Sequence, residues 1–363
     1  MVQRTSIGLD VHARSVVGHG IDKETGEVFR HYFGKDQGNE DVIGWVVGLP
    51  GPVAVCYEAG PTGYGLARAF IAAGVKCLVA APSRLLPAPG EKVKTDRRDA
   101  AHLAGLLAAG LVTPVRIPDV DEEAIRDLLR ARDDARCDLM RARHRLSKLL
   151  LRHGIVYDGK TPWNQTHLAW LRRQHFDQAP LQVTFDNDLA AVITIVSRRD
   201  CLDKQLVELA ETSPYRPIIK ALSCLRGVEL LTAFGLAVEI GDWSRFTGAT
   251  IGAYLGLVPS EHSSGQSRHQ GGITKTGNKY ARRLLVEAAW DHQSTYRPSS
   301  PRLRKRWAQE LDPLIIARAD QANRRLHAQW CKFIKQGKKP TTANAAVARE
   351  LAGFCWSLAT MAT

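Results

Sequence analysis

The chain has 363 residues, enough for two or three domains, and its apolar content is ordinary for a globular protein. Lys and Arg number 50 against 37 acidic residues, and the resulting charge of +13 favours a polyanionic partner, nucleic acid before an anionic membrane. No apolar run reaches the roughly 18 residues of a membrane span, and the first residues lack the apolar core of a signal peptide, so we expect a cytoplasmic protein with no membrane partner.

The first part of the chain alternates between strand-like and helix-like segments. Apolar and β-branched stretches bounded by turn residues predict strands, and apolar positions at helical spacing predict helices. This order favours an α/β domain over residues 1–115, with a mixed central sheet. The expected strands are Ser6–Val11, Ser15–Ile21, Glu27–Phe33, Pro52–Glu58 and Val75–Ala80, and the expected helices are Asn39–Leu49, Gly63–Ala73 and Thr95–Ala109.

Two prolines, Pro114 and Pro118, mark the end of this domain. A charged helix over 121–154 and a second over 189–211 follow, separated by an irregular stretch, and predict a helical linker over 116–214. The two helices are expected to pair as a hairpin or as a coiled-coil dimer arm. Residues 215–363 predict a mainly α C-terminal domain, with a polar Gly/Ser-rich loop at 256–278.

Four acidic residues lie at the ends of predicted elements in the first domain. Asp10 and Glu58 end two strands, and Asp96 and Asp99 share one face at the start of a helix. If the four side chains converge on one edge of the sheet, their oxygens suit Mg²⁺ or Mn²⁺. Each also has a structural interpretation, since Asp10 could begin a turn, Glu58 could be solvated and Asp96 could cap its helix.

The polar loop at 256–278 concentrates hydroxyl groups and cations. Ser260, Ser263, Ser264 and Ser267 offer hydroxyls that need activation to act as nucleophiles, and the alternative is a flexible polar loop. Basic residues here and beside the aspartates are predicted phosphate contacts, with a solvated basic face as their alternative. These residues are Arg97, Arg98, Arg268, Lys275, Lys279, Arg282 and Arg283.

Two sets of motifs resemble a known family. IGLDVH, CYEAG and KTDRRDA are similar to the DEDD-type N-terminal domain of the IS110 insertion-sequence transposases, which has a ribonuclease-H-like (RuvC-like) fold. AYLGLVPSEHSSGQSRHQGGITKTGNKYARRLLVEAA resembles the C-terminal transposase domain of the same family, and together the resemblances cover roughly 5–110 and 220–295. The family pattern of serine before glycine falls on Ser264, and the adjacent Ser263 stays open as the alternative.

The resemblance implies a DNA transposase that cuts and rejoins target and donor DNA through a phosphoserine intermediate. It also implies that Asp10, Glu58, Asp96 and Asp99 hold the metal, and that an RNA encoded by the element guides the protein. The charge and the exposed-looking Trp163, Trp170, Trp307 and Trp330 are consistent with an RNA partner. Exchange between two duplexes predicts a dimer, or a tetramer on DNA, in a bacterial cytoplasm.

Two other functions are alternatives to a transposase. A metal-dependent RuvC-like nuclease, such as a Holliday-junction resolvase, would use the carboxylates with water as nucleophile and would not need the serines. A nucleic-acid-binding scaffold would need neither, and the presence of all four acidic residues argues against it. Seven scattered cysteines without a CxxC pair indicate reduced thiols, so zinc and disulfides are not expected.

Overall fold

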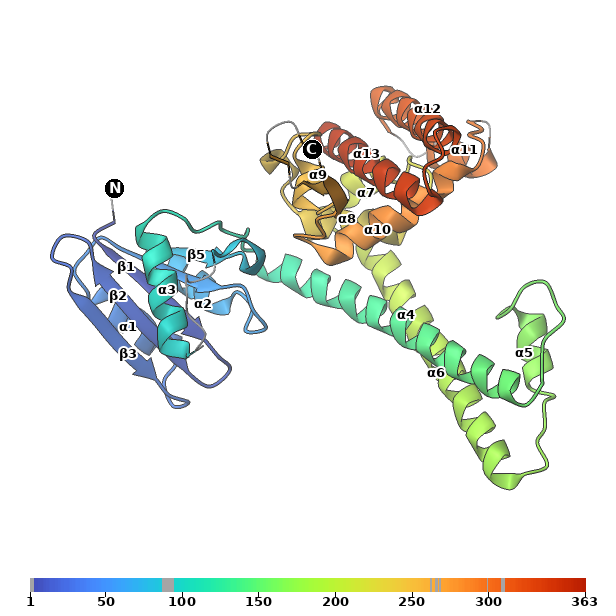
Figure 1. Cartoon of the computed structure of the whole chain (residues 1–363), viewed down its shortest axis with the longest axis horizontal. Helices are drawn as coiled ribbons and strands as arrows, with labels where there is room; N and C mark the ends of the chain where they lie inside the picture. Colours follow the sequence, from blue (N-terminus) through green and yellow to red (C-terminus); the bar gives the residue numbers. More distant parts are fainter. Residues whose placement is uncertain are drawn as a thin grey trace. The chain divides into compact units, whose positions relative to one another are not determined.

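A computed structural model describes residues 3–86, 95–261, 263–264, 267, 269–298, 300–307 and 311–363, with Arg302 and Arg306 described for their backbone only. Contacts divide the chain into two compact units, Met1–Asp119 and Val120–Thr363 (Figure 1). Within the described residues, none of the helices combines the length and apolar character that a bilayer span requires.

The first unit is built on a five-stranded mixed sheet with the order β3-β2-β1-β4-β5, which confirms the predicted mixed sheet. Strands β1, β4 and β5 run parallel, and β2 is antiparallel to both of its neighbours. Short turns join the antiparallel strands, whereas helices join the parallel ones. The strands are β1 (Thr5–Val11), β2 (Val16–Asp22), β3 (Val28–Phe33), β4 (Val53–Glu58) and β5 (Lys76–Ala80).

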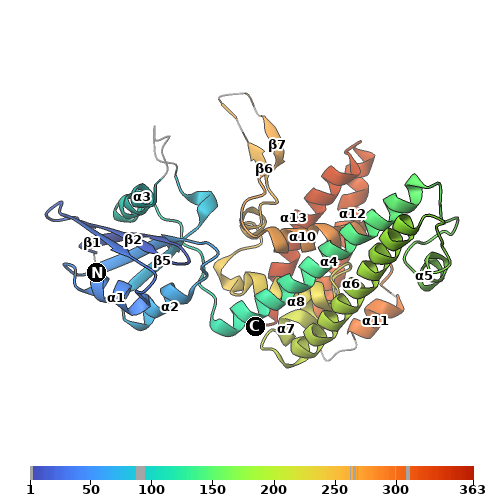
Figure 2. The ribbon, with the colours of Figure 1, turned by 90° about the horizontal axis from the view of Figure 1, so that it is seen from below.

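Helices cover both faces of this sheet, as Figure 2 shows for α3 on one side and α1 and α2 on the other. Helices α1 (Asn39–Val47) and α2 (Gly65–Ala72) pack on the face that carries Ile7, Leu9, Val55 and Tyr57. Helix α3 (Asp96–Ala108) packs through Leu103 and Leu107 on the opposite face, against Ala54 and Cys56. Because side chains alternate along a strand, each residue of β1 and β4 faces one set of helices or the other.

The close approach of α3 to β1 depends on a glycine. A Cβ atom at Gly8 would lie 2.1 Å from the carbonyl oxygen of Ala100 and 2.5 Å from the backbone nitrogen of Ala104. Both atoms belong to the helix backbone, so only a residue without a side chain lets α3 rest on the strand at this distance. This contact fixes the height of α3 above β1, two residues before Asp10.

The second unit begins with two long helices, α4 (Val120–Arg152) and α6 (Ala179–Thr212), which pack along each other (Figure 2). The prediction that 155–185 is irregular is wrong in part. Helix α5 (Gln165–Leu171) lies within this stretch, and α6 starts at Ala179, ten residues before the predicted start. The early turns of α6 are polar in sequence, but Phe185 and Leu189 bury against α4 and α5, so tertiary packing supplies the stability that local sequence lacks.

The remainder of the second unit is mainly helical, as predicted. Helix α8 forms its centre, because every residue from Ala233 to Ile240 is buried. Helix α4 also packs on α8, so the long helices share contacts with the C-terminal part, and the predicted division at residue 214 stays a prediction. The elements are α7 (Arg216–Leu222), α8 (Leu230–Ile240), α9 (Ile251–Tyr254), β6 (Pro259–Glu261), β7 (Gln270–Ile273), α10 (Lys279–Ala289), α11 (Pro301–Trp307), α12 (Pro313–Lys335) and α13 (Pro340–Met361), with short 3-10 turns at Pro82–Arg84, Trp243–Arg245 and Trp290–Gln293.

Candidate functional site

The carboxyl ends of two neighbouring parallel strands place Asp10 and Glu58 at one edge of the sheet. Asp10 shares the α3 face with Gly8, since the two are separated by one residue in β1. Leu9 pairs with Tyr57 in the parallel register, so the next residues, Asp10 and Glu58, follow at the same level. The pleat therefore directs both carboxylates to the side of the sheet that α3 covers.

The first turn of α3 supplies the other two acidic residues. Asp96 is the first residue of the helix, and Asp99 follows one turn later. Oxygen atoms of Asp10 and Asp96 and a ring nitrogen of His12 all lie within 4.8 Å of one another. Nε2 of His12 is 3.3 Å from Oδ2 of Asp10 and 3.7 Å from Oδ2 of Asp96. The fold thus brings together residues that lie more than eighty positions apart in sequence.

Charge accumulates at this cluster. Burial raises the pKa of Asp10, and the nearby carboxylates of Asp96 and Asp99 raise it further, whereas His12 opposes the shift. Like charges held this close are unfavourable unless a cation offsets them. Carboxylate oxygens are ligands that Mg²⁺ and Mn²⁺ prefer, and an imidazole adds a nitrogen donor. The residues present therefore fit a divalent metal ion.

Glu58 lines a cleft together with Asp10 and His12, and among the described residues none of α3 is part of its lining. The cleft has a volume of about 770 Å³ and is also lined by the glycine-containing turn after β4. The structure thus brings Asp10 and Asp96 into direct proximity, places Asp99 near enough to act on Asp10, and puts Glu58 at the wall of the cleft. Sequence reasoning missed His12, although its position two residues after Asp10 was a usable signal of a shared face.

The predicted polar loop at 256–278 is a β-hairpin. Strands β6 and β7 pair antiparallel, and backbone hydrogen bonds of 3.2 and 3.1 Å join Ser264 and Ser267 in both directions. Figure 2 shows the hairpin projecting from the helices of the second unit. We call residues Pro259–Ile273 the serine hairpin. The predicted phosphate contact Arg268 lies outside the described residues.

The two candidate nucleophiles have different surroundings within the serine hairpin. The hydroxyl of Ser263 donates to Oε1 of Glu261 at 2.8 Å and accepts from the backbone N–H of His269 at 3.3 Å. Ser264 is exposed and lies at the end of the described hairpin ladder. Both serines are exposed; the Ser263 hydroxyl has two partners within the hairpin, whereas Ser264 pairs with Ser267 through its backbone.

A network of buried polar contacts supports the chain where the hairpin joins the helices. Arg282 donates to the carbonyl oxygens of Leu255 at 3.0 Å and Thr276 at 2.7 Å, and burial lowers its pKa. Asn278 caps α10 and donates to the carboxylate of Glu239 at 2.6 Å. Glu239 is only 1% exposed and also accepts from Arg130 at 3.1 Å. The base of the hairpin is therefore anchored to the centre of the second unit.

The predicted phosphate contacts divide into two groups. Lys275 and Lys279 are exposed near the base of the hairpin, and Arg97 and Arg98 are exposed on α3, where Arg98 also interacts with the rest of the protein. Arg282 and Arg283 have internal partners, because Arg283 pairs with Asp133 at 2.7 Å and with Glu287 at 2.6 Å. A phosphate would have to compete with these internal bonds for Arg282 and Arg283.

The prediction of exposed tryptophans is wrong for Trp330. Its side chain is 8% exposed and packs edge-on against Trp290, with the ring centroids 5.6 Å apart. Trp163 lies under the guanidinium of Arg143. A role for Trp330 in base stacking would require unpacking the helical core.

Comparisons with known proteins agree over most of the chain. A transposase domain of the DEDD type, designated DEDD_Tnp_IS110, matches residues 7–155, and the domain described as Transposase IS116/IS110/IS902 family matches residues 219–308. The chain is 40% identical to "Putative transposase y4qE" of Sinorhizobium fredii, over 97% of this chain and 88% of that protein. It is 32% identical to "Transposase for insertion sequence element IS1533" of Leptospira borgpetersenii, over 93% of this chain and 99% of that protein. The chain therefore belongs to the IS110/IS116/IS902 family of transposases.

Proposed function

We propose that this transposase cuts and rejoins DNA through a covalent bond between a phosphate and Ser264, assisted by a divalent metal at the carboxylate cluster. The observation that carries the proposal is the approach of Asp10, His12 and Asp96 to within 4.8 Å at the edge of the sheet. An exposed serine on a projecting hairpin supports it, since a nucleophile must reach a phosphate on a bulky duplex. Ser263 is the alternative nucleophile because its hydroxyl donates to a carboxylate.

The proposed reaction is a pair of transesterifications. The serine hydroxyl gives up its proton and its oxygen bonds to phosphorus, while the phosphorus–oxygen bond to one strand end breaks. That end takes up one proton and leaves as a hydroxyl, so protons balance. Attack by a hydroxyl of another strand end reverses these changes and frees the serine. The number of phosphoester bonds stays constant, so no nucleoside triphosphate is needed to rejoin the strands.

Asp10, Glu58, Asp96 and Asp99 would hold the metal, with His12 as an additional candidate ligand. When bound, Mg²⁺ or Mn²⁺ would offset negative charge that develops on the phosphate. The serine and the carboxylates belong to different compact units, so the reaction requires that both act on one phosphate, from one chain or from two. The exposed Arg97, Arg98, Lys275 and Lys279 would contact neighbouring phosphates.

We further propose that the first unit has the ribonuclease-H-like fold, and that 116–214 acts as a helical arm between it and a C-terminal transposase domain. Parallel strands β1, β4 and β5 beside an antiparallel β1-β2-β3 meander support the fold. The charge of +13 supports an element-encoded guide RNA. A transposase that acts on the DNA of a bacterial cell would work in the cytoplasm. Exposed apolar side chains along the arm, Met140, Val183, Ile193 and Val207, support a dimer, or a tetramer on DNA.

A trapping experiment tests the nucleophile and the metal site together. The protein, the RNA of its element, and labelled target and donor DNA are incubated with Mg²⁺ and stopped with detergent, and label that migrates with the protein is measured. Wild type, Ser263→Ala, Ser264→Ala and Asp10→Ala are compared. We expect an adduct that is lost with Ser264→Ala and with Asp10→Ala but is retained with Ser263→Ala.

The other outcomes reject parts of the proposal. Loss of the adduct with Ser263→Ala and its retention with Ser264→Ala would move the nucleophile by one residue. DNA cutting without an adduct in any sample would indicate hydrolysis, as in a RuvC-like nuclease or Holliday-junction resolvase. Sedimentation that shows only monomers, with and without nucleic acid, would contradict the proposed oligomer.

A further inference from the structure

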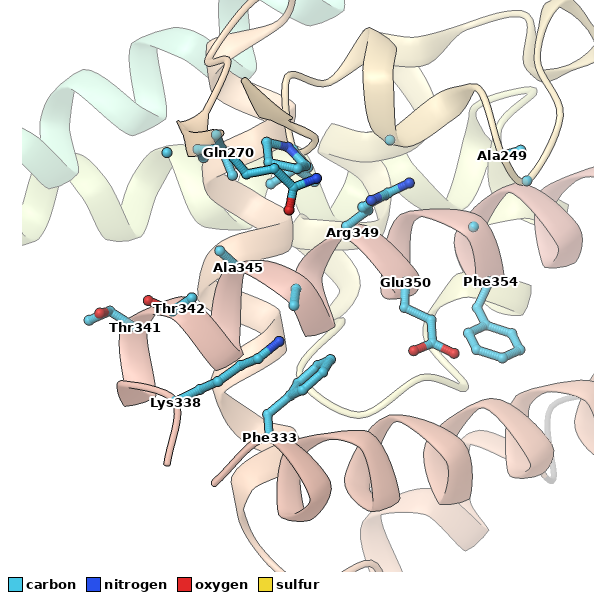
Figure 3. Close-up of a pocket in the computed structure, with 18 of the residues that line it drawn as sticks. Ala249, Gln270, Phe333, Lys338, Thr341, Thr342, Ala345, Arg349, Glu350 and Phe354 are labelled. Carbon is cyan, nitrogen blue, oxygen red and sulfur yellow. The ribbon is translucent and has the colours of Figure 1, made fainter. Parts of the chain in front are cut away.

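A groove of about 820 Å³ crosses the exposed face of α13 in the second unit (Figure 3). Small residues of α9 and α13 form its floor, among them Gly252, Ala345, Ala346 and Gly353. Helix α12 forms one wall, and the base of the serine hairpin forms the other through Pro259 and Gln270–Ile273. The residues that line the groove all belong to the second unit.

The walls of the groove are cationic and aromatic. Four cationic side chains line it against one carboxylate, that of Glu350, and Arg325 pairs with this carboxylate. Lys338 lies over the ring of Phe333, with its ammonium 4.2 Å from the centroid, and Arg318 lies 4.9 Å over Phe354. Arg318 also donates to Ser357 at 3.0 Å and to Gln321 at 2.7 Å, whereas Lys338 points into the groove (Figure 3). Aromatic rings beside cations are typical of surfaces that bind single-stranded nucleic acid. The cations are Arg318, Arg325, Lys338 and Arg349.

Arg349 stands at the middle of the groove. Its side-chain stem rests on Gly252, where an added Cβ would be 3.0 Å from its Cγ. Figure 3 shows Arg349 and Glu350 leaving α13 in opposite directions, so the carboxylate does not neutralise this guanidinium directly. Lys338 and Gln270 point toward the same groove from the α12 side and from the hairpin. A phosphate in the groove would therefore meet Arg349 from the floor, Lys338 from the α12 side and the neutral amide of Gln270 from the hairpin.

The groove is continuous with the serine hairpin. Gln270 lines the groove and pairs with Glu261, and Ser264 lies three residues beyond that pair. Three residues of fully extended chain span at most about 10 Å, which limits how far Ser264 can lie from Glu261. Successive nucleotides of one DNA strand are about 3.4 Å apart along a duplex axis. A strand bonded at Ser264 would reach the groove within about three nucleotides.

We propose that this groove binds the unpaired DNA strand next to the phosphate that the serine attacks, with phosphates on Arg349 and Lys338 and bases against the aromatic walls. The position of the strand rests on the proposed role of Ser264, but the binding of single-stranded DNA does not. The groove would hold the cut end near the hairpin while its new partner arrives. Charge complementarity favours a nucleic acid, and contact with the base of the hairpin that carries Ser264 favours DNA, the substrate of the proposed reaction, over RNA.

Binding by the full chain to a fluorescent oligodeoxythymidylate of about twelve nucleotides tests the proposal. The double variant Arg349→Gln/Lys338→Gln removes two charges and keeps most of each side chain. We expect about tenfold weaker affinity for the double variant. The slope of log affinity against log salt concentration should be shallower by about 1.4, because each phosphate contact to a single strand contributes about 0.7 to that slope. The control Lys148→Gln/Lys204→Gln removes two exposed charges from α4 and α6 and should change neither quantity by more than a small fraction.

Cross-linking locates the strand independently of affinity. An oligonucleotide with 5-bromodeoxyuridine is irradiated with the protein, and we expect labelled peptides that contain Phe333, Phe354 or Trp356. Cross-links confined to other peptides, or equal losses of affinity in the groove and control variants, would overturn the proposal. An oligouridylate that binds wild type more tightly than the DNA, and loses more affinity in the groove variant, would assign the groove to RNA and also overturn it.

The Ser264→Ala variant separates this inference from the proposed reaction. It should bind and cross-link like wild type, because the groove does not include the serine. If no serine adduct forms in the trapping experiment but the groove variants still lose binding, the reaction is wrong and the groove stands. If adducts form normally and the groove variants bind DNA like the control, the groove is wrong and the reaction stands.

Discussion

Replacement of Asp10 by asparagine should change the stability of the first unit in opposite directions with and without metal. Without metal, the ionised Asp10 lies beside Asp96, whose oxygen is no more than 4.8 Å away, and burial raises the pKa of Asp10. Asp10→Asn removes one of the two charges and keeps the shape of the side chain. We therefore expect the metal-free variant to be more stable than wild type.

The size of this effect follows from the geometry. Two unit charges about 4.8 Å apart repel by about 3.5 kcal/mol at an effective dielectric constant of about 20, and by about 0.9 kcal/mol in water. The Asp96 side chain is 57% exposed, and His12 lies close to both carboxylates, so solvent and the imidazole reduce the repulsion. We expect Asp10→Asn to raise the free energy of unfolding by about 1–2 kcal/mol in EDTA.

Metal should reverse the order of stability. At a free Mg²⁺ concentration about a hundredfold above its dissociation constant, wild type gains about 2.7 kcal/mol, and the variant, which lacks a charged ligand, gains much less. Thermal and urea unfolding of the full chain, in EDTA and in Mg²⁺, measure the stability of each protein without and with metal. Asp36→Asn, which removes an exposed charge from the same unit, is the control and should behave as wild type.

The pH dependence has a definite sign. Asp10 is protonated in both the folded and unfolded states well below its ordinary pKa of 3.8, so wild type and Asp10→Asn should be equally stable there. Folding raises this pKa, so the unfolded state loses its proton first, and the wild type loses stability as the pH rises above 3.8. A wild type that is more stable than Asp10→Asn in EDTA at neutral pH, or that gains nothing from Mg²⁺, would refute the reasoning.

Two further predictions concern the second unit. His292 is buried, and burial together with the charges of Arg226 and His327 lowers its pKa from 6.5 to about 3. As the pH falls, the unfolded state therefore binds a proton before the folded state does. The free energy of unfolding should fall by up to about 1.4 kcal/mol per pH unit between pH 6.5 and 3. Urea unfolding between these pH values should show that the stability of His292→Gln depends less on pH than that of wild type. If both proteins lose stability equally as the pH falls, His292 is not the cause of that loss. Arg282→Ala should lose about 1–3 kcal/mol of stability because two carbonyls lose their donor, whereas Lys275→Ala should unfold like wild type but bind DNA less tightly. Equal unfolding curves for these two variants would contradict the structural role of Arg282.

The pattern of apolar and turn residues was sufficient to predict the strands of the first unit. The predicted strand Ser6–Val11 is observed as Thr5–Val11, and Pro52–Glu58 as Val53–Glu58, because turn residues bound both apolar runs. Alternation along β1 and the parallel register with β4 then make the approach of Asp10 and Glu58 to one edge a consequence of sheet geometry. The place of α3 above that edge could not be predicted, since Gly8 contributes to it through the absence of a side chain.

Long-range contacts explain what the sequence did not reveal in the second unit. Ser263 and Gly271 are poor strand formers, yet the serine hairpin forms through backbone pairing and the bond from Ser263 to Glu261. Arg283 belongs to a basic run in the sequence, but its partner Asp133 lies 150 residues earlier, on α4. A charged residue shows from sequence that it can bind a phosphate, and only the fold shows whether it already has a partner.

The contact between Gly8 and α3 bears on how degenerate copies of insertion elements should be recognised. A copy with alanine at this position would retain Asp10, Glu58, Asp96 and Asp99. A search of its sequence for these four acidic residues would therefore classify it as intact. Yet its added methyl group would meet the backbone of α3 at Ala100 and Ala104, and the helix would have to move by on the order of 1 Å. That movement would carry Asp96 away from Asp10, so the first inactivating change in a genomic lineage can fall on a residue with no chemistry of its own.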